Sequence, residues 1–102
     1  MKRLVLWTYK FNVKQQILAK IKKLPNLSFS EAAVECFYEM VQTENIATGD
    51  DQSFMAFDYH KTLPKAVEEY AETEKEIVTV VSCFLMAIEN SYNPFDLLDK
   101  YA

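Results

Sequence analysis

A clear helical pattern follows Ser28. Ser28 and Glu31 have the spacing of a capping box, in which each side chain bonds the backbone N–H of the other residue. Apolar residues then recur every three or four positions from Phe29 to Val41, as they do along one face of a helix. The pattern predicts a helix that buries this face, with Gly49 available to end it.

Residues 3–11 allow two structures. Their large apolar side chains alternate as in a strand, but Leu4 and Leu6 on the other side also suit a buried helix, which we favour. From Asn12, which can serve as an N-cap, apolar residues recur at helical spacing until Pro25 ends the helix.

The longest helical pattern begins between Thr62 and Pro64 and continues to Asn90. Glutamates flank its first half, whereas Ile77–Ile88 is apolar nearly all round, which predicts that other elements surround that segment. A short last helix should open at Asn93, which can cap it and is followed directly by proline.

These patterns predict an all-α fold. We expect a single compact helical bundle of four or more helices around a central long helix, with residues 1–102 as one domain. The one glycine in the chain leaves few positions for the tight turns of a β-rich fold. The alternative is an α+β fold, in which residues 4–11 form a short N-terminal strand paired with residues 54–59.

Charge is divided unevenly along the chain. Residues 1–23 carry seven basic residues and no acid, whereas residues 24–102 carry 15 acids and four lysines, within a net charge of −4. Trp7, Tyr9 and Phe11 in the basic part suggest contact with nucleic acid. The acidic remainder would repel phosphate, however, so we expect no direct binding of nucleic acid.

Other classes of function find little support in the sequence. No apolar run approaches the ~20 residues that span a bilayer, and the N-terminal run stops short of a signal peptide, so we expect a cytoplasmic protein that binds no membrane. Cys36 and Cys83 stand in apolar surroundings without metal or redox spacing, which predicts reduced, buried thiols. His60, which we expect on the surface or in a loop, has no nearby nucleophile, so we expect no catalytic residue, cofactor or metal ion.

One enzyme class is an alternative. Glu69 and Glu72 match the first Glu-x-x-Glu pair of MazG-type nucleotide pyrophosphohydrolases, which are Mg²⁺-dependent all-α enzymes. The second pair of that family is Glu-x-x-Asp, and here Thr79 follows Glu76 in place of the aspartate. Because the chain resembles the family in the first pair alone, we expect no enzymatic activity.

Acidic residues beside tyrosines indicate a surface for a basic protein partner. Tyrosine is enriched at protein interfaces, and complementary charge raises the rate of association. The candidate partner-binding residues are Glu35, Tyr38, Glu39, Asp50, Asp51, Asp58, Tyr59, Glu68, Glu69 and Glu72.

In length, acidity and helical character the chain resembles small bacterial immunity proteins of the contact-dependent-inhibition or colicin type. The resemblance implies a monomer that binds a basic toxin domain, such as a nuclease, one to one and covers its substrate site. Phage-encoded inhibitors of host nucleic-acid enzymes fit the same description, and a homodimeric structural subunit is a further alternative. Our functional hypothesis is a non-enzymatic inhibitor that neutralises a basic protein.

Overall fold

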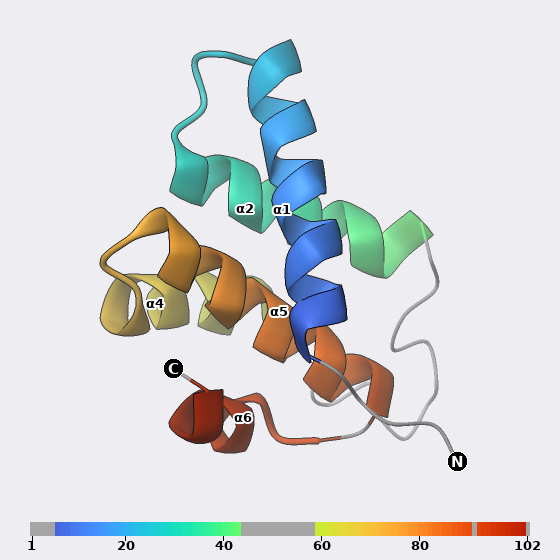
Figure 1. Ribbon diagram of the computed structural model, residues 1–102, viewed down its shortest axis with the longest axis vertical. Helices are drawn as coiled ribbons and strands as arrows, with labels where there is room; N and C mark the ends of the chain where they lie inside the picture. The colour runs from blue at the N-terminus through green and yellow to red at the C-terminus, as the bar shows by residue number, and fades with distance from the viewer. Residues whose placement is uncertain (1–5, 44–58, 91, 102) are drawn as a thin grey trace.

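The chain is helical in every element that the structure describes (Figure 1). The computed structural model describes residues 6–43, 59–90 and 92–101. The helices are α1 Leu6–Lys23, α2 Phe29–Thr43, α4 Tyr59–Tyr70, α5 Glu74–Asn90 and α6 Pro94–Tyr101. The predicted all-α class is confirmed over these residues, whereas a strand at residues 6–11 is wrong because they are helical. Gly49 and residues 54–58 lie outside the described part of the chain.

Helix α1 begins earlier than its predicted cap. Asn12 lies inside the helix with its side chain exposed, so the expectation that it opens a new helix is wrong. Tyr9, Val13 and Ile17 recur at helical spacing, and all three pack into or against the core. One inward face therefore continues through the predicted boundary, and Pro25 stands two residues after the end of α1, as expected.

The capping box at the start of α2 is formed as predicted. The backbone N–H of Glu31 donates to Ser28 Oγ at 3.1 Å, and the N–H of Ser28 donates to Glu31 Oε1 at 2.9 Å. Helix α6 is capped by Asn93, whose Oδ1 accepts from the N–H of Phe95 at 2.8 Å. In both cases a side-chain oxygen satisfies an N–H that the first helical turn leaves without a partner.

The expected long helix from residue 62 to residue 90 is wrong, because it is divided into α4 and α5. A second capping box causes the division: the N–H of Glu76 donates to Thr73 Oγ1, and the N–H of Thr73 donates to Glu76 Oε1, both at 3.2 Å. Helix α4 also begins earlier than expected, at Tyr59, so that His60 lies in its first turn and Pro64 lies within it.

Helix α5 contributes more residues to the core than any other described helix. All residues of the segment Ile77–Ile88 are buried, and α5 contacts each of the other four described helices. The two hydroxyl residues of this segment, Thr79 and Ser82, donate hydrogen bonds to backbone carbonyls one turn earlier. Ser82 Oγ donates to Val78 O at 2.7 Å. Cys36 and Cys83 are buried free thiols, as predicted.

Aromatic rings join the helices around α5. Phe84 is fully buried and makes edge contacts with Phe37 of α2 and Phe95 of α6, at ring-centroid distances of 6.2 and 6.0 Å. Tyr70 at the end of α4 also lies against Phe95. The radius of gyration is 12.8 Å, close to the ~13 Å of a compact chain of this length.

Candidate protein-binding surfaces

A groove between α2 and α4 brings acids and apolar side chains together. It has a volume of about 370 Å³ and is lined by Leu27, Ser30, Glu31, Val34, Glu35, Pro64 and Val67. Below we call it the α2–α4 groove. Its apolar members come from both helices and from the turn before α2, while both of its carboxylates come from α2.

The two carboxylates of the α2–α4 groove differ in their surroundings. Glu31 accepts the capping hydrogen bond of Ser28, so its carboxylate is held at the helix start. Glu35 is exposed, and within the described residues no ion pair to it is present. Glu68 is exposed and follows Pro64 by four residues, which places it on the same side of α4 as the groove. The groove thus offers an apolar floor with the exposed carboxylate of Glu35 at its edge and Glu68 nearby.

The other predicted residues of α2 are separate from this groove. Glu39 forms an ion pair with Lys20 of α1, in which the ammonium of Lys20 donates a hydrogen bond to the carboxylate. This hydrogen bond raises the pKa of Lys20. Tyr38 is half-buried, and its ring lies against Phe37. Burial is the larger cause that raises the pKa of its hydroxyl, and the negative charge of Glu35 is the smaller one. Of the three candidates on α2, the structure therefore places only Glu35 at the groove.

The remaining candidates lie on α4 or outside the described residues. Glu69 is exposed on α4 and Glu72 is exposed in the turn after it. Glu76, which the enzyme alternative would need as a ligand, instead accepts hydrogen bonds from the N–H groups of Thr73 and Glu72. Tyr59 opens α4. The residues outside the described ranges are Asp50, Asp51 and Asp58.

The sequence analysis missed a second groove, along α1. Trp7, Phe11 and Leu18 are 69%, 61% and 46% exposed, although they are among the most apolar residues of that helix. Together with Phe29 and Val78 they line a hollow of about 540 Å³, which we call the α1 groove. The spacing of Trp7, Phe11 and Leu18 places them on one face of a helix, so the sequence does contain the pattern. The strand-like alternation instead groups Trp7 and Phe11 with Tyr9, which packs against the core.

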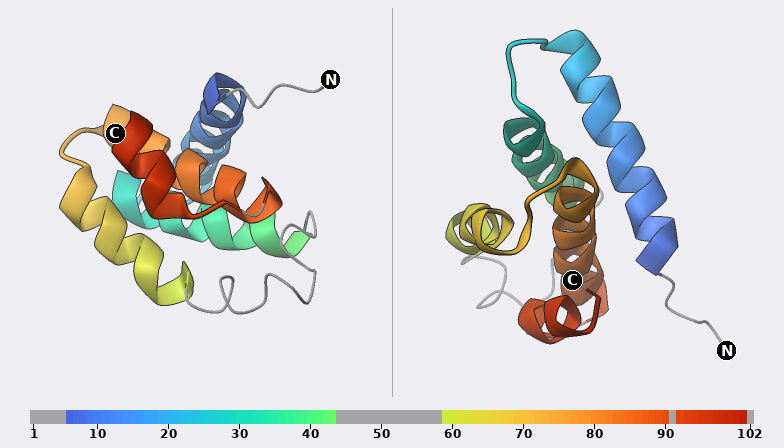
Figure 2. Two further views of the ribbon diagram at one scale, coloured as in Figure 1. Left: turned by 90° about the horizontal axis from the view of Figure 1, so that it is seen from below. Right: turned by 60° about the vertical axis from the view of Figure 1, so that its left-hand side comes forward.

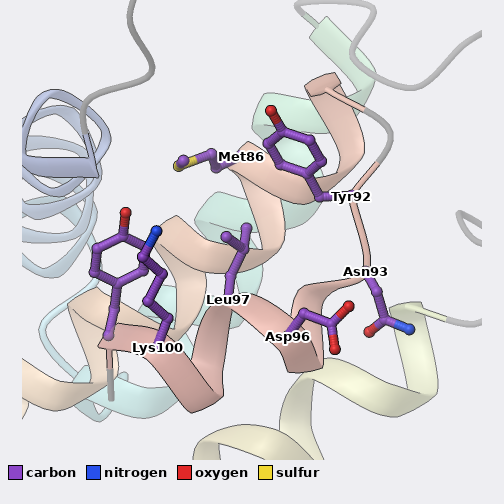
Figure 3. A pocket seen from close by; sticks show the side chains of 7 residues that line it. Met86, Tyr92, Asn93, Asp96, Leu97 and Lys100 are labelled. Carbon is purple, nitrogen blue, oxygen red and sulfur yellow. The ribbon is translucent and has the colours of Figure 1, made fainter.

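A third hollow, of about 400 Å³, lies beside α6 (Figure 3). Met86 and Leu97 form its apolar part, and Asp96 and Lys100 stand one turn apart on α6. The Lys100 ammonium lies 5.4 Å from the centre of the Tyr101 ring, in cation–π range. The residues that line this hollow include no serine, threonine, cysteine or histidine, and we assign it no chemistry.

Within residues 6–43, 59–90 and 92–101 there is no group of three or more histidine, cysteine, aspartate or glutamate side chains that could hold a metal ion. None of the described helices is long and apolar enough to cross a bilayer. No protein-family model, curated protein or solved structure matches the chain significantly.

Proposed function

We propose that this protein is a non-enzymatic inhibitor that binds a basic protein one to one and neutralises it. The observation that supports the proposal is the α2–α4 groove, with an apolar floor and the free carboxylate of Glu35 at its edge. Long cationic side chains combine an apolar stem with a charged head. A lysine or arginine of the partner can therefore lay its stem on Val34 and Val67 and bring its head to Glu35.

Further acids lie outside the groove. Glu68, Glu69 and Glu72 follow along α4 and its end, and all three are exposed. Such a cluster attracts a basic partner over distances up to the Debye length of about 8 Å at physiological salt. Fast capture of this kind suits an inhibitor that must reach a toxic enzyme before the enzyme acts.

At finer detail, we propose an immunity protein that acts in the cytoplasm on a toxin domain of the nuclease type. A nuclease must bind phosphate, and its substrate site is therefore basic. An acidic groove with an apolar floor is complementary to such a site, and its occupation would exclude the nucleic acid. The protein would act as a monomer in this complex.

The experiment that tests the proposal is a rescue assay with charge-reversed variants. Each open reading frame that flanks this gene is expressed in a naive host, with or without this protein, and survivors are counted. We expect one neighbour to kill, and the wild-type protein to restore growth. Glu35→Lys should abolish rescue, whereas Asp99→Lys, which makes the same charge change at an exposed site on α6, should retain it.

Two outcomes would count against the proposal. If no neighbouring gene is toxic, the inhibitor loses its target. If a neighbour is toxic and Glu35→Lys rescues as well as the wild type does, the protein is an inhibitor that does not use the α2–α4 groove.

A further inference from the structure

Helix α1 exposes a row of large apolar side chains that the core does not use. Val13 and Ile17 are fully buried on its inner face, whereas Trp7, Phe11 and Leu18 are mostly or half exposed on another face. Trp7 and Leu18 are eleven residues apart, which is about 16 Å along a helix. Rows of this size on a soluble domain usually mark an interaction site.

The row forms one wall of a real hollow. Phe29 at the start of α2 and Val78 near the start of α5 also line the α1 groove. Val78 is buried and Phe29 is half-buried, so both are held in place by the core. The groove therefore has an apolar floor on rigid helices, into which side chains of a partner can insert.

Cations surround the α1 groove. Lys10, Lys14 and Lys75 line it together with a single acid, Glu74. Lys14 and Lys75 are exposed, and Lys10 is half-buried beside the row. The groove thus has the opposite sign of charge to the α2–α4 groove, although the protein as a whole is acidic.

We propose that the α1 groove binds an acidic amphipathic helix of a partner protein. Apolar side chains of that helix, spaced one turn apart, would contact Trp7, Phe11 and Leu18, and its carboxylates would meet Lys10 and Lys14. Recognition of a helix in an apolar groove uses such anchors at i, i+4 and i+7. The lysines select acidic ligands because a basic segment would be repelled.

Charge also argues against a second copy of this chain as the occupant. In a two-fold symmetric contact the same patch meets itself, so six lysines of the two copies would be brought together with only two acids. A single-stranded nucleic acid could stack on the aromatic rings, but Glu74 in the groove opposes its phosphates. A peptide with separated apolar and acidic side chains can avoid that contact.

The α1 groove is independent of the surface in the proposed function. Figure 2 shows α1 and α4 on opposite sides of α2 and α5. A ligand on α1 would therefore leave the α2–α4 groove open, and the protein could hold two partners of opposite charge at once. Loss of binding in one groove need not remove binding in the other.

The protein contains its own reporter for this proposal. Trp7 is the only tryptophan in the sequence and lies in the row. The probe is a synthetic helical peptide of about twelve residues, with leucine at i, i+4 and i+7 and glutamate on the remaining faces. We expect it to shift the Trp7 emission to shorter wavelength in a saturable way, because the exposed indole becomes covered.

Matched variants locate the binding. Phe11→Ala should weaken binding of the peptide by about tenfold or more, as truncation of an aromatic anchor does. The pair Lys10→Glu with Lys14→Glu should also weaken binding strongly. The control pair, Lys22→Glu with Lys65→Glu, has the same net charge but lies outside the groove, and it should bind like the wild type. Circular dichroism verifies that each variant is folded.

Three results would overturn the proposal. The first is an unchanged Trp7 emission in the presence of the acidic peptide. The second is tighter binding of a lysine-for-glutamate version of the peptide, or of a short oligothymidylate. The third is a concentration-dependent dimer in sedimentation whose formation is abolished by Phe11→Ala, since the occupant would then be a second copy of the chain.

Discussion

At the scale of single residues, Tyr9 joins the first turns of α1 to the last turn of α5. Its hydroxyl donates to the carboxylate of Glu89 and accepts from Asn90 Nδ2 at 3.4 Å. Burial, and then the hydrogen bond to Glu89, raise the pKa of Tyr9 to about 12. The residue was expected to belong to an aromatic alternation, and it is instead the link between two helix ends.

Removal of this hydroxyl should lower stability without changing the fold. We expect Tyr9→Phe to reduce the free energy of unfolding by about 1 kcal/mol, the usual net value of an intramolecular hydrogen bond. Urea denaturation followed by circular dichroism measures the change. An unchanged midpoint would mean that water replaces the hydroxyl at no cost.

The two buried thiols predict a loss of stability in alkali. Burial raises the pKa of Cys36 and of Cys83 from 9.0 to about 11. Above pH 9 the unfolded chain loses thiol protons that the folded chain keeps, so stability is complete below pH 9 and falls as pH rises towards 11. The slope approaches about 1.4 kcal/mol per pH unit for each thiol.

This pH dependence can be assigned by substitution. Between pH 9 and 10, we expect the unfolding free energy of the wild type to fall, and that of the double variant Cys36→Ala with Cys83→Ala to fall less steeply, because only the raised pKa values of groups such as Tyr9 and Lys20 still contribute. The loss of the two sulfur atoms lowers the unfolding free energy by the same amount at every pH, so it does not affect the slopes that are compared. Equal slopes in the two proteins would contradict the assignment to the thiols.

At the scale of elements, two capping boxes set the beginnings of α2 and α5. The first, Ser28 with Glu31, was recognised because an apolar stripe begins directly after it. The second, Thr73 with Glu76, has the same spacing but lies within a longer apolar pattern. Local hydrogen bonds therefore override a continuous stripe when a side chain can satisfy the free N–H groups of a new helix.

The box at Thr73 should be measurable as a cap. We expect Thr73→Ala to lower the free energy of unfolding by about 1 kcal/mol and Thr73→Ser to leave it almost unchanged, since serine caps equally well. Chemical denaturation of the two variants gives the comparison. A similar loss in both would show that the threonine methyl group matters and the hydroxyl does not.

How far the elements follow from the sequence depends on which force sets each boundary. Proline at residue 25 and the capping side chains at residues 28 and 93 act within one helical turn, and those boundaries were predicted correctly. The start of α1 was not, because Leu6 and Tyr9 are ambiguous until a core exists against which they pack. The hydrophobic pattern identified Ile77–Ile88 as buried, since it has no polar face to expose.

Like charges on α2 lead to a prediction that separates stability from binding. Glu31 and Glu39 flank Glu35 at four residues on either side, where carboxylates repel each other. Glu35→Lys removes these repulsions but also the attraction between Glu35 and Lys20, so we expect the free energy of unfolding to change by no more than about 0.5 kcal/mol while rescue in the assay proposed above is abolished. Thermal unfolding measures the change in stability. If Glu35→Lys is strongly destabilised, its loss of rescue would result from unfolding and not from lost binding.

At the scale of the whole molecule, basic and acidic helices lie directly against each other. The basic α1 packs beside α2, which carries three glutamates, whereas α4 lies on the far side of α2 and α5 and carries two lysines and two glutamates (Figure 2). The polarity could be predicted by counting charges, but not which acids share a surface. Glu35 lies in a groove with α4, whereas Glu39, one turn later, pairs with Lys20 of α1.

The exposed row on α1 is another feature that the sequence alone could not place on the surface. Periodicity indicates that Trp7, Phe11 and Leu18 share a helix face, but it does not show whether another helix covers that face. Only the packing of α1 on α2 and α5 decides this, and it buries Val13 and Ile17 instead. Interaction surfaces of this kind depend on tertiary structure and cannot be assigned from composition.

The measurement that tests the central claim most directly is the rate of association with the toxic neighbour, followed by stopped flow over a range of salt concentrations. We expect a fast rate that falls steeply with salt for the wild type and for Asp99→Lys, because complementary charge steers the encounter. Glu35→Lys and Glu68→Lys should each associate more slowly and with weaker salt dependence. Equal rates and equal salt dependence in all four proteins would contradict the account.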